Sequence, residues 1–240
     1  MKVASSVIFV RPRDDIYEIL LLRRNPNLSS FGGYYAFPGG IIEDQDTYEH
    51  WLDIAPDFVK KNDYFDFNKR VSAVRESFEE VNFLMTSNSK DNLRDEYLKA
   101  DNFATYCKSK EMEPDLANLK AYLRVGSPVN HYPVFDAQFY FYFVDEKMAS
   151  TLQMNHDEFT DAKWLTVAEA LHMFKEQELA LFVPQVIVLS RLMFTGAASH
   201  NLASLKAMLE HTDKIAPSYL SQRNHIFMLG HKNFKSDAAR

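Results

Sequence analysis

One short segment of this 240-residue chain combines a helical pattern with a dense group of carboxylates. From Lys69 onward, apolar residues recur at spacings of three and four, which places them on one face of a helix: Val71, Val74, Phe78 and Val81. Such a face must be buried against a hydrophobic core. The segment therefore predicts a helix that packs on a folded domain, with its polar residues at the margin of the packed face.

Three glutamates lie along the same predicted helix. Glu76 and Glu80 are four residues apart, so they lie on one side, one turn apart, and Glu79 flanks them. Mg²⁺ takes carboxylate oxygens together with phosphate oxygens and water, and the cation would remove the repulsion between the glutamates. The pattern predicts a site for Mg²⁺ (or Mn²⁺). A solvated acidic face, in which Arg75 simply pairs with Glu79, would have the same composition.

A second feature, upstream, bears on this choice. The segment Phe37-Pro38-Gly39-Gly40 ends a short aromatic stretch, 34–37, that is typical of a strand. A Gly-Gly pair lets the backbone turn sharply and approach a phosphate closely. Taken together and in this order, the glycine turn and the acidic helix favour a metal and phosphate site over an acidic surface.

The rest of the chain alternates strands and helices, which predicts a mixed α/β domain with helices on both faces of a sheet. Strands are expected at 3–10, 16–23, 135–144 and 162–165. Helices are expected at 48–54, within an acidic insertion of about 43–68, at 93–108, 114–122, 166–175 and 184–194, and once more after residue 201. This length suits one large core better than two. We therefore expect a single domain over 1–240, with a C-terminal helical extension from about residue 196.

Composition limits the partners. The net charge of −6 argues against a general nucleic-acid binder, although a capped RNA end stays open as a substrate. The absence of any run of 18 apolar residues predicts no contact with a membrane. A single cysteine, Cys107, fits a reducing intracellular compartment, cytoplasmic or organellar. The last residues, 237–240, carry no recognisable peroxisomal signal. The oligomeric state stays open.

The spacing of these motifs resembles a known family. Gly40 followed by Arg75-Glu76-x2-Glu79-Glu80 resembles the Nudix box, Gly-x5-Glu-x7-Arg-Glu-U-x-Glu-Glu-x-Gly-U, where U is aliphatic. Here about twenty extra residues separate Gly40 from Arg75. Three residues depart from the pattern: Asp46 replaces its first glutamate, Ser77 an aliphatic residue and Asn82 the last glycine.

The split box is similar to that of the nucleoside diphosphate-linked moiety X motif 19 family, the peroxisomal coenzyme A diphosphatases. The strand at 135–140 and the segment Lys163-Trp164-Leu165 resemble the same family. The resemblance implies a Nudix α/β/α sandwich and a peroxisomal or mitochondrial location. It also implies hydrolysis of a nucleoside diphosphate linked to another moiety. For coenzyme A or acyl-coenzyme A the products would be 3',5'-ADP and (acyl-)phosphopantetheine.

Alternatives remain. The substrate could be ADP-ribose, NADH, a dinucleotide or a capped RNA. A protein of another class, a Nudix-fold module that binds nucleotides without hydrolysing them, also fits the sequence.

The alignment with the box assigns a role to each candidate site residue. Glu76 and Glu80 would bind the metal, and Glu79 would bind metal or activate water. Arg75 would orient the carboxylates, and Gly40 would offer its carbonyl to the metal. Arg24 or Arg23 would grip a substrate phosphate. A base could also come from loop 156–158, although we favour a polar surface turn as the explanation of that loop.

Overall fold

The apolar N-terminal segments form the centre of a mixed β-sheet in the computed structural model, which describes residues 1–86, 94–126, 134–194, 201–212 and 219–221. The strands are β1 (Lys2–Arg13), β2 (Ile16–Arg24), β3 (Tyr35–Ala36), β4 (Gly39–Ile41), β5 (Lys120–Gly126), β6 (Phe135–Phe143), β7 (Phe159–Leu165) and β8 (Tyr219–Ser221). The pairs β1–β6 and β5–β8 are parallel, whereas β1–β2, β2–β7 and β5–β6 are antiparallel. Strands are present in all five segments where the sequence predicted one: 3–10, 16–23, 34–37, 135–144 and 162–165.

Strand β1 changes its partner along its length, and this change positions the glycine turn. Residues 10–13 of β1 pair with β2, whereas residues 4–6 pair with β4. The two hairpin strands therefore separate, and the segment with Gly39 and Gly40 enters the sheet beside Ser5 and Ser6. The sequence predicted a turn at 38–40. The structure adds a short strand, because these glycines allow the backbone to approach β1 closely.

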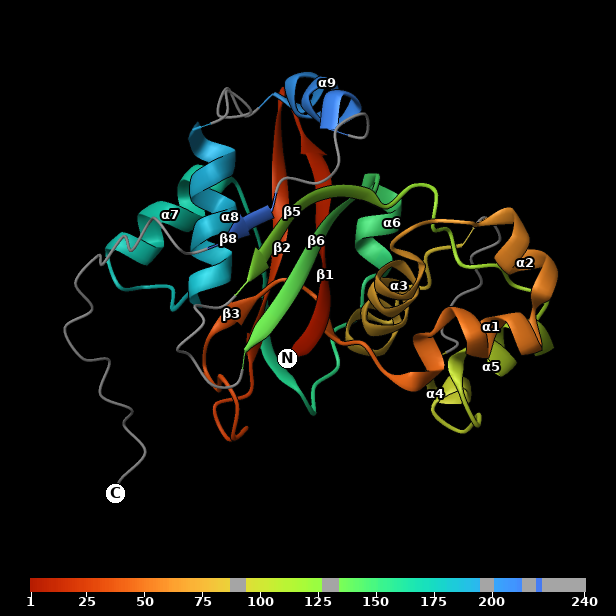
Figure 1. Cartoon of the computed structure of the whole chain (residues 1–240). Coiled ribbons are helices and arrows are strands. Elements are labelled where there is room, and N and C mark those ends of the chain that lie inside the picture. The colour runs from red at the N-terminus through yellow and green to blue at the C-terminus, as the bar shows by residue number, and fades with distance from the viewer. Residues whose placement is uncertain (87–93, 127–133, 195–200, 213–218, 222–240) are drawn as a thin grey trace.

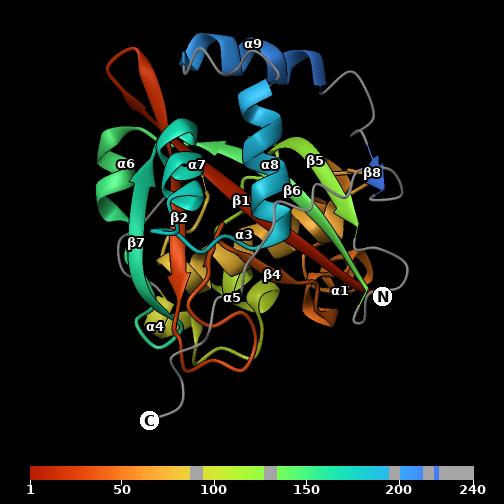
Figure 2. The same ribbon diagram turned by 90° about the vertical axis from the view of Figure 1, so that its left-hand side faces the viewer.

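Helices cover both faces of the sheet, as Figures 1 and 2 show. Side chains alternate along β1, so Val7 and Phe9 face one core, and Ile8 and Val10 face the other. The first face carries α1 (Tyr48–Ile54), α2 (Pro56–Lys61), α3 (Phe67–Val81), α4 (Arg94–Tyr97), α5 (Phe103–Ser109) and α6 (Glu146–Thr151). The second carries α7 (Val167–Lys175), α8 (Val183–Phe194) and α9 (Leu202–Thr212). This arrangement confirms the predicted α/β sandwich.

Helix α3 follows its sequence pattern closely. Its four predicted apolar residues, Val71, Val74, Phe78 and Val81, are at most 1% exposed. The helix ends at Asn82, which adopts the left-handed conformation (φ 52°, ψ 34°) and donates its backbone N–H to the carbonyl of Phe78. Asn tolerates this conformation better than most residues, so it can replace the glycine that usually ends such a helix.

Three predicted helical segments differ from the structure. The helix expected at 114–122 is wrong, because the chain forms turns up to Leu119 and then enters β5. Leu116, Leu119 and Leu123 mimic helical spacing, but pairing with the aromatic strand β6 overrides that local pattern. The helix expected at 93–108 is two helices, because Asn102 caps α5 by accepting a hydrogen bond from Thr105 N. The insertion holds α2 and the 3-10 turn η1 (Asp44–Asp46) as well as α1.

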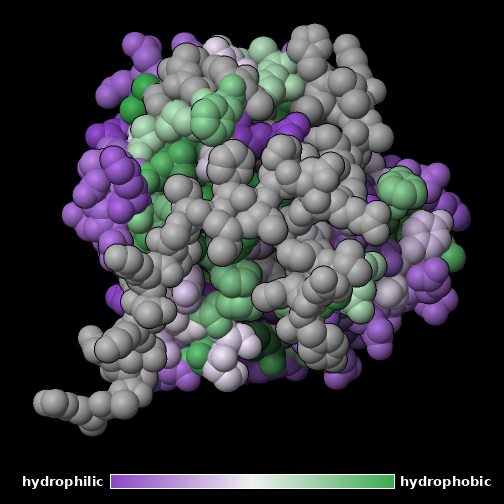
Figure 3. Space-filling view, turned by 60° about the vertical axis from the view of Figure 1, so that its left-hand side comes forward, coloured by the Kyte–Doolittle hydropathy of each residue, from purple (hydrophilic) through white to green (hydrophobic). Residues whose placement is uncertain are grey.

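The surface on the α7 and α8 side mixes hydrophilic and hydrophobic residues (Figure 3). Val183 and Phe194, at the two ends of α8, are 51% and 86% exposed.

In the part of the chain that the structure describes, no helix has both the length and the apolar character needed to cross a bilayer. The C-terminal tetrapeptide 237–240 and most of the predicted extension lie outside the described residues.

Candidate active site

The glycine segment of β4 lies directly against two glutamates of α3. The backbone N–H of Gly39 donates a hydrogen bond to Glu80 Oε2 at 2.8 Å. Gly40 contacts Glu76 so closely that an added Cβ would lie 2.4 Å from the carboxyl carbon of Glu76. Gly39 has a φ of 150°, and a Cβ there would lie 2.2 Å from the carbonyl oxygen of Ser5. A side chain at Gly39 would clash with the backbone of β1, and one at Gly40 would displace the Glu76 carboxylate, so the glycine pair is required for the glutamates to converge here.

Burial gives these two glutamates unusual acidities. Glu80 is 3% exposed, and burial, followed by the negative charge of Glu76, raises its pKa well above the usual value. Burial also raises the pKa of Glu76 from 4.5 to about 7, and the nearby Arg75 only partly opposes this effect. Two carboxylates in such surroundings repel each other when ionised. A divalent cation between them would relieve that repulsion.

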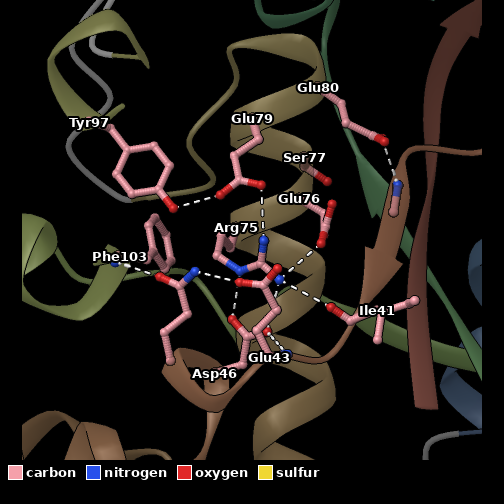
Figure 4. Close-up of polar contacts among 12 residues, drawn as sticks. Ile41, Glu43, Asp46, Arg75, Glu76, Ser77, Glu79, Glu80, Tyr97 and Phe103 are labelled. Atoms are coloured by element: carbon pink, nitrogen blue, oxygen red, sulfur yellow. Dashed lines mark hydrogen bonds and ion pairs between the residues drawn. The ribbon is translucent and has the colours of Figure 1, made fainter. Parts of the chain in front are cut away.

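Arg75 is the centre of a buried ionic network (Figure 4). Its Nε and Nη2 donate to the two carboxylate oxygens of Asp46 at 2.8 and 2.9 Å, and Asp46 is fully buried. Its Nη2 also lies 2.9 Å from Glu76 Oε1, and its Nη1 donates to Glu79 Oε2 at 2.9 Å. Arg75 itself is 1% exposed. This burial places Arg75 behind the carboxylates, in a position to orient them.

Glu79 points away from the other two glutamates (Figure 4). Its Oε1 accepts a hydrogen bond from the hydroxyl of Tyr97 at 2.6 Å, and its Oε2 pairs with Arg75. Both oxygens therefore have partners within the protein. The role of Glu79 as metal ligand or base stays a prediction, and the structure does not bring its carboxylate to the glycine segment.

The loop 155–158 and the end of β2 complete the surroundings of Glu80. The backbone N–H of Asn155 donates to the Glu80 carbonyl at 2.7 Å, and its side chain donates to Glu158 Oε1 at 3.1 Å. The charge of Glu158 raises the pKa of Glu80, and the charge of Arg24 lowers it. Both side chains are therefore close enough to act on the site. His156 and Asp157 are exposed.

Arg24 and Arg23 lie on opposite faces of the sheet, because side chains alternate along β2. Arg24 shares the face of Leu20 and Leu22, which pack on the α3 side, whereas Arg23 shares the face of Leu21. Arg24 stacks over Phe159 at 5.7 Å from the ring centre and donates to the carbonyl of Ser30. Of the two arginines, only Arg24 is positioned toward the glutamates.

The sequence missed two contributors. Asp46 could have been assigned its role, because it occupies the place of the first glutamate in the box pattern and lies six residues after Gly40. Its carboxylate is the principal partner of Arg75. Tyr97 carries no comparable signal, because α4 follows residues 87–93, which lie outside the described residues, and only the folded chain brings it to Glu79.

The donor set fits Mg²⁺ with some of its ligands supplied from outside the chain. No group of three or more His, Cys, Asp or Glu side chains arranged to hold a metal occurs among the described residues. Mg²⁺ is commonly held by one or two carboxylates, with waters and substrate phosphates as the other ligands. Glu76 and Glu80 meet that need, since Glu80 is buried, the side chain of Glu76 is only 14% exposed, and the charge of Glu76 raises the pKa of Glu80.

The fold is shared with a solved structure. A Nudix hydrolase from Alicyclobacillus acidocaldarius superposes with a TM-score of 0.69 and 19% sequence identity, over 88% of this chain and 96% of that one. This likeness, with the glutamates of α3 set against a glycine turn, defines the chain as a Nudix fold.

The family follows from the sequence. The family model described as the NUDT19 Nudix domain matches residues 60–192, which is more than half of the chain. The chain therefore belongs to this family of Nudix hydrolases.

Two relatives show how far the likeness extends. Acyl-coenzyme A diphosphatase NUDT19 of Xenopus laevis is 26% identical over 73% of this chain. Putative nudix hydrolase 7 of Caenorhabditis elegans is 28% identical over 72% of this chain. The chain matches 60% and 55% of the lengths of these two proteins.

Proposed function

We propose that this protein hydrolyses the diphosphate bond of a nucleotide-linked substrate with the help of Mg²⁺, and that the substrate is coenzyme A or an acyl-coenzyme A. The observation that carries the proposal is the convergence of Glu76 and Glu80 on the Gly39–Gly40 backbone. Family membership and the printed activity of the Xenopus relative support the choice of substrate.

We assign each site residue a separate role in this proposed hydrolysis. Glu76 and Glu80 would hold the metal, with the Gly40 carbonyl as a further oxygen ligand. When bound, Mg²⁺ would neutralise the diphosphate and polarise the phosphorus that water attacks. Arg75 fixes the carboxylate of Glu76 through an ion pair at 2.9 Å, and Asp46 holds Arg75 in turn. Arg24, on the same face, would bind a phosphate oxygen of the substrate.

The attacking water must lose a proton as its oxygen bonds to phosphorus and the bridging P–O bond breaks. Glu158 is the further carboxylate whose charge reaches Glu80, and the loop that carries it is fastened to α3 by Asn155. We assign this proton to Glu158 ahead of Glu79, because both oxygens of Glu79 are already engaged by Arg75 and Tyr97.

A direct test compares three substrates side by side. The purified protein is incubated with coenzyme A, ADP-ribose or NADH, with Mg²⁺ or with a chelator, and the products are identified by mass spectrometry. We expect Mg²⁺-dependent formation of 3',5'-ADP and phosphopantetheine from coenzyme A. Faster cleavage of ADP-ribose or NADH would overturn the substrate assignment. Binding of all three compounds without any product would instead identify a nucleotide-binding module.

A further inference from the structure

A group of accessible aromatic side chains lies beside Arg24, where β3 forms the edge of the sheet. Its members are Phe31, Tyr34 and Phe182, and we call them the aromatic cluster. The ring centres of Phe31 and Phe182 are 4.3 Å apart, and those of Tyr34 and Phe182 are 6.1 Å apart at nearly a right angle. Phe31 is 40% exposed, and the other two residues are half-buried. The proposed hydrolysis gives these rings no role.

Strand alternation directs the aromatic cluster to the face of the sheet that holds the proposed metal ligands. The backbone N–H of Arg24 donates to the carbonyl of Tyr34 at 2.9 Å, and Tyr35 packs into the second core. Tyr34 therefore points to the opposite side, as Arg24 does. Leu181 bridges to Tyr35 and also packs into the second core, so the next residue, Phe182, points to the first face with Tyr34.

Arg24 fixes Phe31 next to the place where a substrate phosphate would bind. The Nε of Arg24 donates to the carbonyl of Ser30 at 3.3 Å, and Phe31 is the next residue. The backbone N–H of Gly33 donates to the Arg24 carbonyl at 2.9 Å, which closes the loop against β2. Burial is the main cause of the raised pKa of Glu80, and the charge of Arg24 opposes it. The guanidinium is therefore a neighbour of both the ring and the metal site.

The backbone of Phe31 is strained. Phe31 has a φ of 57°, in the left-handed region that a bulky residue rarely adopts, although Gly32 and Gly33 follow it directly. Glycine at this position would make the same turn without strain. Strained residues of this kind cluster at ligand sites, so an exposed ring in this conformation is explained if it contacts a ligand.

We propose that the aromatic cluster stacks on the base of the nucleotide substrate, and that Arg24 binds the phosphate nearest to that base. Aromatic rings stack on any nucleobase, because every base has a π face. One ribose separates the base of a nucleotide from its phosphate. The whole pantetheine arm, in contrast, separates the acyl chain of an acyl-coenzyme A from the diphosphate. A ring beside the phosphate-binding arginine therefore suits the base and not the chain.

This inference sets the direction in which the substrate lies. Its nucleoside end would lie at the β3 edge of the sheet, and the moiety beyond the diphosphate would extend away from that edge. The inference rests on the proposed function for the phosphate at Arg24, and it holds for any substrate of the site that carries a base.

The test measures binding in chelator and needs no turnover. Titrations followed by NMR compare 5'-AMP with ribose 5-phosphate, which lacks only the base. We expect the wild type to bind 5'-AMP about tenfold more tightly, as one stacked base would give. The H2 and H8 protons of adenine should also shift upfield on binding, because they would lie over aromatic rings. Phe31→Leu should abolish most of the preference and of the shift, whereas Phe31→Tyr, which keeps a ring, should retain both.

Phe65→Leu is the matched control, because it makes the same change at a fully exposed ring in the loop before α3. It should leave the preference and the shift intact. Phe31→Gly, which relieves the left-handed backbone, repeats the test if the leucine variant unfolds.

Equal affinity of the wild type for the two ligands, or an undiminished preference in Phe31→Leu, would overturn the inference. Titrations of coenzyme A and octanoyl-coenzyme A test the other occupant. If Phe31→Leu keeps the preference for the base and weakens only octanoyl-coenzyme A, the aromatic cluster holds the acyl chain and the inference is wrong. Because hydrolysis is assayed separately, a preference for the base without any product would contradict the proposed function and leave this inference standing.

Discussion

Neighbouring glutamates of α3 have very different surroundings. Glu79 has its oxygens satisfied by Arg75 and Tyr97, and its carboxylate belongs to the folded framework. Glu76 and Glu80 are more deeply buried, are close enough to repel each other, and have fewer donors. The comparison teaches that three carboxylates in one box need not have one role. Protein donors engage both carboxylate oxygens of Glu79, whereas Glu76 and Glu80 are the proposed ligands of a cation from solution.

Removing the centre of the framework should have the largest effect. Arg75→Met leaves Asp46 and Glu79 without their cation in a buried site, which should lower the free energy of unfolding by about 3–5 kcal/mol. Chemical denaturation measures this loss. Arg13→Met is the control, because its guanidinium is half exposed and should contribute at most about 1 kcal/mol. Equal losses in the two variants would contradict the view that Arg75 holds the framework together.

Removing a carboxylate from the other group should affect turnover and spare the fold. Glu80→Gln deletes a charge that the protein leaves without a cation, so Mg²⁺-dependent turnover should fall on the order of 10³-fold. The melting temperature without metal should stay the same or rise, since a neutral amide avoids the cost of burying an ionised carboxylate, which is the cost that raises the pKa of Glu80. Glu49→Gln, on the exposed side of α1, should change neither quantity. Wild-type turnover in Glu80→Gln at saturating Mg²⁺ would rule out the assigned metal site.

This contrast marks what the sequence can predict. The apolar stripe of α3, the helix expected at 166–175 and the strand expected at 135–144 rest on local patterns, and they form α3, α7 and β6. The segment 114–122 has a helical spacing too, yet its last residues form a strand because they pair with β6, which follows later in the chain. The pairing of two strands from distant segments cannot be predicted from the residue pattern of either segment alone.

In the candidate site, too, some features follow from local sequence patterns and others depend on long-range contacts. The proximity of Glu76 to Glu80 follows from helix geometry, because residues four apart lie one turn apart, whereas their approach to Gly40, 36 residues earlier in the chain, was indicated by the resemblance to the box. The separation of Glu79 from its neighbours does not follow, since it depends on Tyr97, a residue brought close only by the fold. The choice between Arg23 and Arg24 required the sheet itself, because strand alternation fixes their faces only once both cores are known.

A smaller change tests whether Glu79 is structural. Tyr97→Phe removes one hydrogen bond to a charged group, which should lower the free energy of unfolding by about 1.5 kcal/mol. Turnover should fall by less than tenfold, because the metal carboxylates are untouched. Tyr64→Phe, which keeps its ring stacked on Arg70, serves as the control for loss of a hydroxyl. A collapse of turnover in Tyr97→Phe as deep as in Glu80→Gln would place Glu79 in the chemistry after all.

The smallest expected effect is a pH dependence of stability in the metal-free protein. Burial raises the pKa of Glu76 from 4.5 to about 7, so between these values the folded state holds a proton that the unfolded state has lost. The free energy of unfolding should therefore fall as pH rises through this window, by on the order of 1 kcal/mol for this group.

Denaturation of the wild type and of Glu76→Gln in chelator at pH 5, 6 and 7 isolates the contribution of Glu76 to this fall, because all other titrating groups are common to both proteins. We expect the difference between them to grow with pH and to shrink when Mg²⁺ is added, since a bound cation favours the ionised carboxylate. A difference that is independent of pH would mean that Glu76 is already neutralised by Arg75, and the two groups of glutamates would then no longer differ in the way proposed.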